Sequence, residues 1–118
     1  MFTHIPWSAE AEARMQHPAS GACIQYLKGE VERGIARLWR CEHGVDLAYM
    51  VTRLDRCPDE LVVCYFEGSG LRKFGRAILA AAHSRGVPVR AHTTQPAVAR
   101  LLRAAGLFHS EFVLRSRP

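Results

Sequence analysis

The sequence predicts an α/β (α+β) domain built on one mixed sheet, and three observations predict it. Residues 61–66 are continuously apolar, as in a central strand that is buried on both faces. A helix-period segment and a second short strand follow, and this order implies a parallel pair of strands. Upstream, two strand-like runs flank a short turn and predict an antiparallel hairpin, so the sheet is expected to be mixed.

The first half of the chain is expected to supply two helices and the hairpin. Ser8 is suited to cap a short helix that runs to about His17, because a serine oxygen accepts a hydrogen bond from the first turn of a helix. Ser20 is suited to cap a second helix, which Gly34 ends. The expected strands of the hairpin are residues 35–41 and 47–54, joined by a turn at residues 42–44.

The second half is expected to alternate strands with helices. Gly86 and Gly106 are suited to end its two helices, since glycine adopts the left-handed conformation found at helix C-termini. The expected element order for the whole chain is α-α-β-β-β-α-β-α-β. The expected elements of this half are a strand at 61–66, a helix at 71–85, a strand at 87–92, a helix at 96–105 and a strand at 108–115.

Length and composition favour a single domain, residues 1–118. The chain has 118 residues, 48% of them hydrophobic, and no repeat or Pro/Gly-rich linker divides it. No apolar run approaches the roughly 20 residues that cross a bilayer. Residues 1–7 lack the pattern of a signal peptide. A cytoplasmic location without membrane contact is therefore expected.

The four cysteines do not form a metal-binding pattern. Cys23, Cys41, Cys57 and Cys64 contain no CxxC pair, and only His43 lies close to one of them in sequence. We therefore expect no metal site and no disulfide. The cysteines are expected to be small buried side chains.

Charge is distributed unevenly along the chain. Residues 1–67 hold 7 Lys and Arg against 10 Asp and Glu, whereas residues 68–118 hold 9 Lys and Arg against Glu111 alone. The second half is therefore expected to meet an anion, and nucleotide phosphates and nucleic acid are the obvious choices.

A glycine turn, Gly68–Gly70, joins the buried strand to a basic helix. The first N–H groups of a helix point at whatever lies at its N-terminus, and glycines let the backbone approach a ligand. Arg72, Lys73 and Arg76 add positive charge where the helix dipole is already positive, which is unfavourable unless an anion binds. The alternative interpretation is a plain tight turn in which Ser69 caps the helix.

This region resembles the cofactor-binding half of the GNAT acetyltransferases over residues 61–108. The resemblance rests on residues 66–79 (FEGSGLRKFGRAIL), on Ser84-Arg85-Gly86 and on residues 99–107 (ARLLRAAGL). It implies a mixed central sheet with helices on both faces and a loop that holds the pyrophosphate of acetyl-CoA, the co-substrate. The residues that it places against acetyl-CoA are Phe66, Gly68, Ser69, Gly70, Leu71, Arg72, Lys73, Gly75 and Arg76.

The chain departs from the family pattern at three points. The family loop reads Gln/Arg-x-x-Gly-x-Gly/Ala, and only its last glycine is kept, as Gly75. Leu102 stands where many members carry a tyrosine that protonates the departing CoA thiolate. The family's first strand has no counterpart among the expected elements.

Acetyl transfer to an amine needs a base, and two residues are candidates. Glu67 ends the buried strand, and His92 ends the next one with an imidazole that suits base work. The alternative interpretations are a solvated strand-end acid and an incidental histidine. Tyr65, within the buried strand, is either a proton donor or a core residue.

Three functions remain to be weighed. The first is an acyl-CoA-dependent N-acetyltransferase, and the acidic first half then favours an amine acceptor, either a small molecule or a protein. The second is an inactive GNAT-like domain that binds a ligand or a protein partner. The third, nucleic-acid binding through Arg76, Arg100 and Arg103, is disfavoured because stacking aromatics are lacking. A homodimer is compatible with the sequence.

Overall fold

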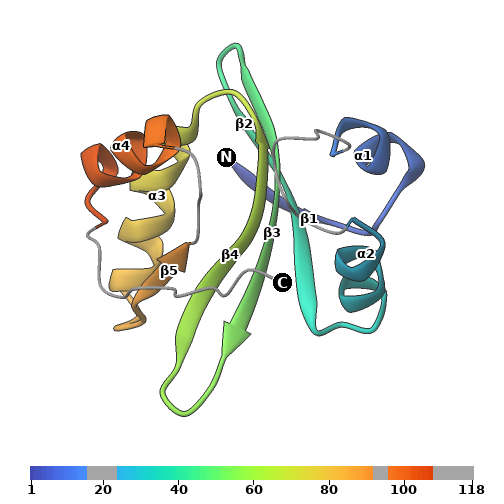
Figure 1. Ribbon diagram of the computed structural model, residues 1–118, viewed down its shortest axis with the longest axis horizontal. Coiled ribbons are helices and arrows are strands. Elements are labelled where there is room, and N and C mark those ends of the chain that lie inside the picture. The colour runs from blue at the N-terminus through green and yellow to red at the C-terminus, as the bar shows by residue number, and fades with distance from the viewer. Residues whose placement is uncertain (16–23, 92–95, 108–118) are drawn as a thin grey trace, which may run out of the picture.

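The computed structural model describes residues 1–15, 24–91 and 96–107, which form a mixed α+β fold (Figure 1). None of the helices in these ranges is long and apolar enough to cross a bilayer. The elements are β1 Phe2–Ile5, α1 Ala9–Arg14, α2 Ile24–Glu32, β2 Ala36–His43, β3 Asp46–Asp55, β4 Glu60–Gly68, α3 Leu71–His83, β5 Val89–Ala91 and α4 Pro96–Ala105.

One sheet holds the described strands in the order β1-β2-β3-β4-β5. Neighbours from β1 to β4 run antiparallel, whereas β5 is parallel to β4, so the prediction of a mixed sheet is confirmed. β2 and β3 form the expected hairpin, but its turn is shorter than expected, because His43 still pairs with Asp46. β4, α3 and β5 form the expected strand–helix–strand unit.

The N-terminal strand was missed by the sequence analysis. β1 pairs with β2 from Phe2 opposite Cys41 to Ile5 opposite Leu38, and the N–H of Glu42 donates to the carbonyl of Met1. β1 is only four residues long, and its exposed polar side chains lie between apolar ones. It therefore contains no run of apolar residues from which a strand could be predicted. The expected element order, which begins with two helices, was therefore wrong at its start.

Element boundaries elsewhere differ from the expected ones by a few residues. Ser8 caps α1 as expected, accepting a hydrogen bond from the N–H of Ala11 at 3.2 Å. β5 begins at Val89, two residues later than expected, because Pro88 has no N–H, and its expected end at residue 92 lies outside the described residues. The expected strand at 108–115 and the start of the second helix at Ser20 lie outside the described residues.

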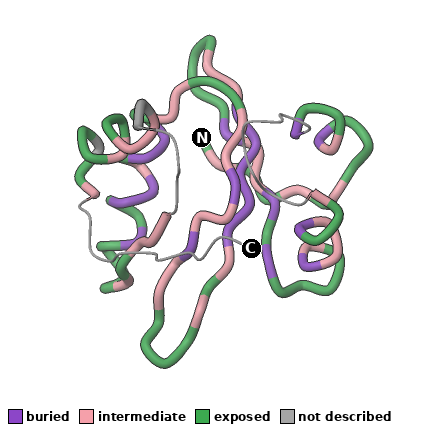
Figure 2. The backbone as a smooth tube through the Cα atoms, in the orientation of Figure 1, coloured by how far each residue is buried: buried purple, intermediate pink, exposed green. Residues whose placement is uncertain are grey.

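Helices cover both faces of the sheet (Figure 1). α1 and α2 lie against one face, and α3 and α4 lie against the other. Side chains along β3 alternate between the two layers: Tyr49 and Val51 enter the core beneath α1 and α2, while Ala48 and Met50 enter the core beneath α3. Figure 2 shows these buried positions gathered along the middle strands.

A β-bulge interrupts β4 at Cys64. Val51 of β3 pairs with Tyr65, whereas the next residue, Thr52, pairs with Val63, so Cys64 is the extra residue. Cys64 and Tyr65 consequently face the same layer, that of α1 and α2. β4 pairs with β5 only from Leu61 to Val63, so within the described chain the far edge of β4 beyond the bulge has no partner strand.

Tyr65 ties the bulged strand to α1. Its side chain is buried, and its hydroxyl donates to the backbone carbonyl of Met15 at 2.5 Å. Met15 is the C-cap residue of α1 and is fully buried, so this bond satisfies a buried helix-terminal carbonyl. Tyr65 is thus a core residue, as one of the two sequence-based interpretations held.

We predict that Tyr65→Phe destabilises the fold by about 1–3 kcal/mol, because the Met15 carbonyl loses a buried donor. Urea unfolding followed by circular dichroism measures the change. Tyr26→Phe is the matched control, since Tyr26 is 61% exposed on α2 and should change stability little. Equal stability of the Tyr65→Phe and Tyr26→Phe proteins would show that the bond contributes nothing.

Candidate functional site

The N-terminus of α3 has no side-chain cap. Gly70 is the N-cap residue, and its carbonyl accepts the first helical hydrogen bond from the N–H of Phe74 at 2.9 Å. The N–H groups of Leu71, Arg72 and Lys73 have no hydrogen-bond partner among the described residues. The helix also has no acidic residue in its first turn, so the positive end of its dipole is left open to a ligand.

Ser69 does not cap the helix, contrary to the alternative interpretation of the turn. Its hydroxyl accepts a hydrogen bond from the N–H of Leu47 at 3.2 Å and bonds to the carboxylate of Asp46. Its own N–H donates to the carbonyl of Leu47 at 3.1 Å. Ser69 therefore fastens the turn to β3.

Gly68 and Gly70 are required by packing of the turn on the protein itself. Both have positive φ angles, 134° and 83°. A Cβ on Gly68 would lie 2.6 Å from the Cα of Ala48, and one on Gly70 would lie 2.9 Å from the ring of Phe74. Their position in sequence, before a basic helix, favoured close approach by a ligand as the reason for these glycines. The structure instead accounts for them by the close approach of β3 and of the Phe74 ring.

Three cations surround the open helix terminus. An open depression of about 560 Å³ is lined by Gly70, Arg72, Lys73 and Arg76. Arg72 is exposed and has no acidic partner in the described ranges. Arg76 donates to the carbonyl of Ala104 at 3.4 Å, which places its guanidinium beside the C-terminal turn of α4.

Asp46 is the site residue that sequence reasoning missed. Its carboxylate lies 2.8 Å from the ammonium of Lys73, and this hydrogen bond, followed by the one from Ser69, lowers the pKa of Asp46. Asp46 is ionised at neutral pH and compensates one of the three cations. No sequence signal joins the two residues, which lie 27 positions apart and meet only because β3 runs beside the turn.

The turn can hold a diphosphate. Three free N–H groups and the guanidinium of Arg72 supply the donors that phosphate oxygens accept, with Arg76 beside them. The negative charge of Asp46 repels an anion at this position, but Asp46 is paired with Lys73, and this pairing offsets the repulsion. The donor set thus fits the pyrophosphate part of a nucleotide-like ligand.

The remaining residues expected at this ligand lie elsewhere. Phe66, Leu71 and Gly75 line a cavity of about 30 Å³ between α3, α4 and the sheet, about the volume of one water molecule in the liquid. Leu102, at the position of the family's tyrosine, lines the same cavity. These side chains form a narrow apolar seam in this structure.

Glu67 faces the opposite layer from this seam. It pairs with Tyr49 across the sheet, on the face that α1 and α2 cover, and is half-buried. Neither an ion pair nor a hydrogen bond of its carboxylate is found in the described part of the chain. His92, the second candidate base, lies outside the described residues.

Cys41 and Cys64 are poor nucleophiles, and the described cysteines form no metal site. Burial raises the pKa of the Cys41 thiol to about 11 and also raises that of Cys64, so both are protonated at neutral pH. Cys57 is exposed, which contradicts the expectation of burial, and Cys23 is not described. No cluster of His, Cys, Asp and Glu that could bind a metal occurs among the described residues.

A second charged cluster lies at the far end of the sheet and is internally compensated. Asp55 contacts Arg53 at 2.7 Å and Arg90 at 3.2 Å, while Arg90 also contacts Glu60 at 3.4 Å. Glu30, buried in α2, lies 3.8 Å from Arg53. These pairs link β3 to β5 and to α2, and we assign them a structural role.

No family model matches the chain, and comparisons with curated proteins and with solved structures found no match either.

We predict that Gly68→Ala lowers the free energy of unfolding by about 3 kcal/mol or more, because the added methyl group meets the backbone of β3 at a positive φ angle. Gly44→Ala is the matched control. Gly44 also has positive φ, but open space surrounds it, so the expected cost is about 1–2 kcal/mol of backbone strain alone. Chemical denaturation measures both, and equal costs would refute the close approach of the turn to β3.

Proposed function

We propose that the chain is an acyl-CoA-dependent N-acetyltransferase of the GNAT type, which moves an acetyl group from acetyl-CoA to an amine acceptor. The observation that carries the proposal is the N-terminus of α3, which has no acid in its own first turn and no side-chain cap, and which opens into a depression lined by Arg72, Lys73 and Arg76. The resemblance over residues 61–108 places the CoA pyrophosphate at this terminus.

The edge of β4 is a second observation in favour of acetyl-CoA as the ligand. Beyond Val63 this edge lacks a partner strand in the described chain, and it leads directly to the glycine turn. The pantetheine arm of CoA carries two amide groups that can pair with backbone N–H and C=O groups. An arm that runs along β4 would bring the thioester toward the bulge at Cys64.

The reaction joins the acceptor nitrogen to the acetyl carbon and breaks the carbon–sulfur bond of the thioester. The amine loses one proton and the CoA thiolate gains one, so the products are an amide and free CoA. Glu67 is the proposed base, because it is a carboxylate on β4 without a competing partner in the described residues. Leu102 cannot donate a proton, so water supplies the proton for the thiolate.

One observation favours an alternative, an inactive GNAT-like domain that binds a ligand or a protein partner. The seam around Leu102 is apolar and leaves only about 30 Å³ of space. Calorimetric titration with acetyl-CoA, followed by an assay of free thiol release with an amine panel, separates the two. Binding without thiol release from any amine would favour the alternative.

We predict that Arg72→Glu combined with Lys73→Glu lowers the affinity for acetyl-CoA by about 100-fold or more, since two attractive charges become repulsive. Isothermal titration calorimetry measures the affinity. Both side chains are exposed, so the variant should remain folded, with only a small loss of stability from the broken Lys73–Asp46 ion pair. Unchanged affinity in a folded double variant would remove the turn from the ligand site.

Asp46→Asn should act in the opposite direction and raise the affinity about threefold. The substitution removes a negative charge beside the phosphate position and releases Lys73 from its ion pair. The same titration measures it, and weaker binding by Asp46→Asn would show that Lys73 needs Asp46 to be held in place.

We predict that Glu67→Gln slows acetyl transfer by about 10²-fold or more while leaving the affinity for acetyl-CoA unchanged, because the amide cannot accept the proton of the amine. Steady-state kinetics at saturating acetyl-CoA measure the rate. Glu42→Gln, at an exposed position of β2, is the matched control and should keep the wild-type rate. An unaltered rate in Glu67→Gln would exclude Glu67 as the base.

A further inference from the structure

The helices α3 and α4 carry more positive charge than a diphosphate requires. Residues 68–107 contain no Asp or Glu at all. Arg72, Arg76, Arg100 and Arg103 are exposed, and none of them forms an ion pair with an acid in the described residues. Lys73 is the exception, since Asp46 already compensates it.

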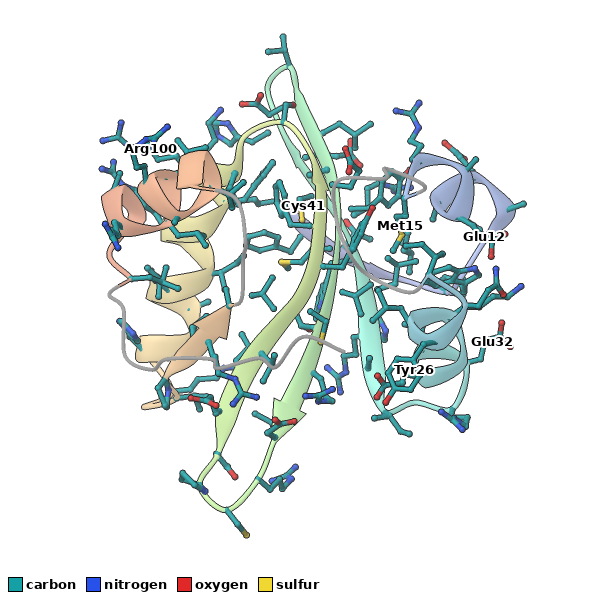
Figure 3. All side chains as sticks on the ribbon, in the orientation of Figure 1. Glu12, Met15, Tyr26, Glu32, Cys41 and Arg100 are labelled. Carbon is teal, nitrogen blue, oxygen red and sulfur yellow. The ribbon has the colours of Figure 1, made fainter. Side chains whose placement is uncertain are left out.

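The two helices bring these side chains to one end of the molecule. In Figure 1, α4 crosses α3 near the end at which β4 passes into α3. Arg76 of α3 donates to the carbonyl of Ala104 at 3.4 Å, and Arg103 is the adjacent residue of α4. Arg100 lies one turn earlier on the same side of α4, and Figure 3 shows it at this end.

A count of charges separates two groups of cations. A diphosphate linkage carries about two negative charges, and the positive N-terminus of α3 together with Arg72 already faces it, while Asp46 balances Lys73. Arg100 and Arg103 of α4, with Arg76 between the helices, remain uncompensated. A phosphate monoester carries about −1.5 to −2 charges at neutral pH and would match them.

We infer that Arg76, Arg100 and Arg103 form a second anion subsite, which binds a phosphate monoester on the same ligand that places its diphosphate at the α3 terminus. The inference rests on the proposed function. It narrows the ligand class to nucleotides that carry a ribose phosphate in addition to a diphosphate, as the 3′-phosphate of CoA does.

A nucleic acid is the competing occupant of this surface, and the structure favours it less. Binding of single strands commonly uses aromatic side chains on which bases stack. In the described parts of α3 and α4, Leu101 is an exposed large hydrophobic residue, but no aromatic residue is exposed. The exposed Tyr26 belongs to α2, which lies on the other face of the sheet. Arg76, moreover, lines the same depression as Arg72 and donates to α4 beside Arg103, which connects the α4 arginines to the diphosphate position.

The test compares CoA with 3′-dephospho-CoA by calorimetry, using the full chain and an Arg100→Ala/Arg103→Ala variant. We expect the wild-type protein to bind CoA about tenfold more tightly than 3′-dephospho-CoA, since the monoester adds charge-assisted contacts. The variant should bind both ligands with the affinity that the wild type has for 3′-dephospho-CoA. Arg85→Ala is the control, because Arg85 is exposed at the opposite end of α3.

The outcomes separate this inference from the proposed function. Equal wild-type affinity for the two ligands would overturn the second subsite and leave the CoA site intact. Absence of binding to either ligand would overturn both. A third outcome would assign the surface to nucleic acid and overturn the inference. In that outcome, single-stranded RNA binds the wild type but not the arginine variant, and CoA does not displace the RNA.

Discussion

The close packing of the glycine turn on β3 determines where α3 begins, and the candidate site depends on it. Gly68 lies against the backbone of Ala48, and Ser69 bonds to both Asp46 and Leu47. These contacts hold the turn independently of any ligand. They orient the first turn of α3 so that its free N–H groups and its cations face the same depression. A larger residue at position 68 would separate the turn from the sheet and move all of these groups together.

The parts of the fold that follow from local pattern could be predicted from the sequence. The apolar run of β4, the stripe of α3 and the bounds of α4 at Pro96 and Ala105 each reflect a period or a cap that a single segment carries. β1 could not be predicted, because its stability comes from pairing with β2. The bulge at Cys64 was hidden as well, since a continuously apolar strand does not reveal which face each residue occupies.

The candidate site was predictable only in part, for a related reason. Arg72, Lys73 and Arg76 are close in sequence, and helical spacing alone brings them to one place. Asp46 joins them through the order of strands in the sheet, which no residue near the turn encodes. The resemblance to the GNAT family grouped Phe66, Leu71 and Gly75 with the phosphate loop, yet the structure places them in a separate apolar seam.

The bulge in β4 decides how the end of this strand is shared between the two cores. Side chains of a regular strand alternate between the faces of a sheet, and an inserted residue moves every later side chain to the opposite face. Because Cys64 is that extra residue, Tyr65 packs in the core beneath α1 and α2, and Phe66 packs in the core beneath α3. Strict alternation from Val63 onward would exchange the two rings, and the Tyr65 hydroxyl would then point away from the Met15 carbonyl that it binds.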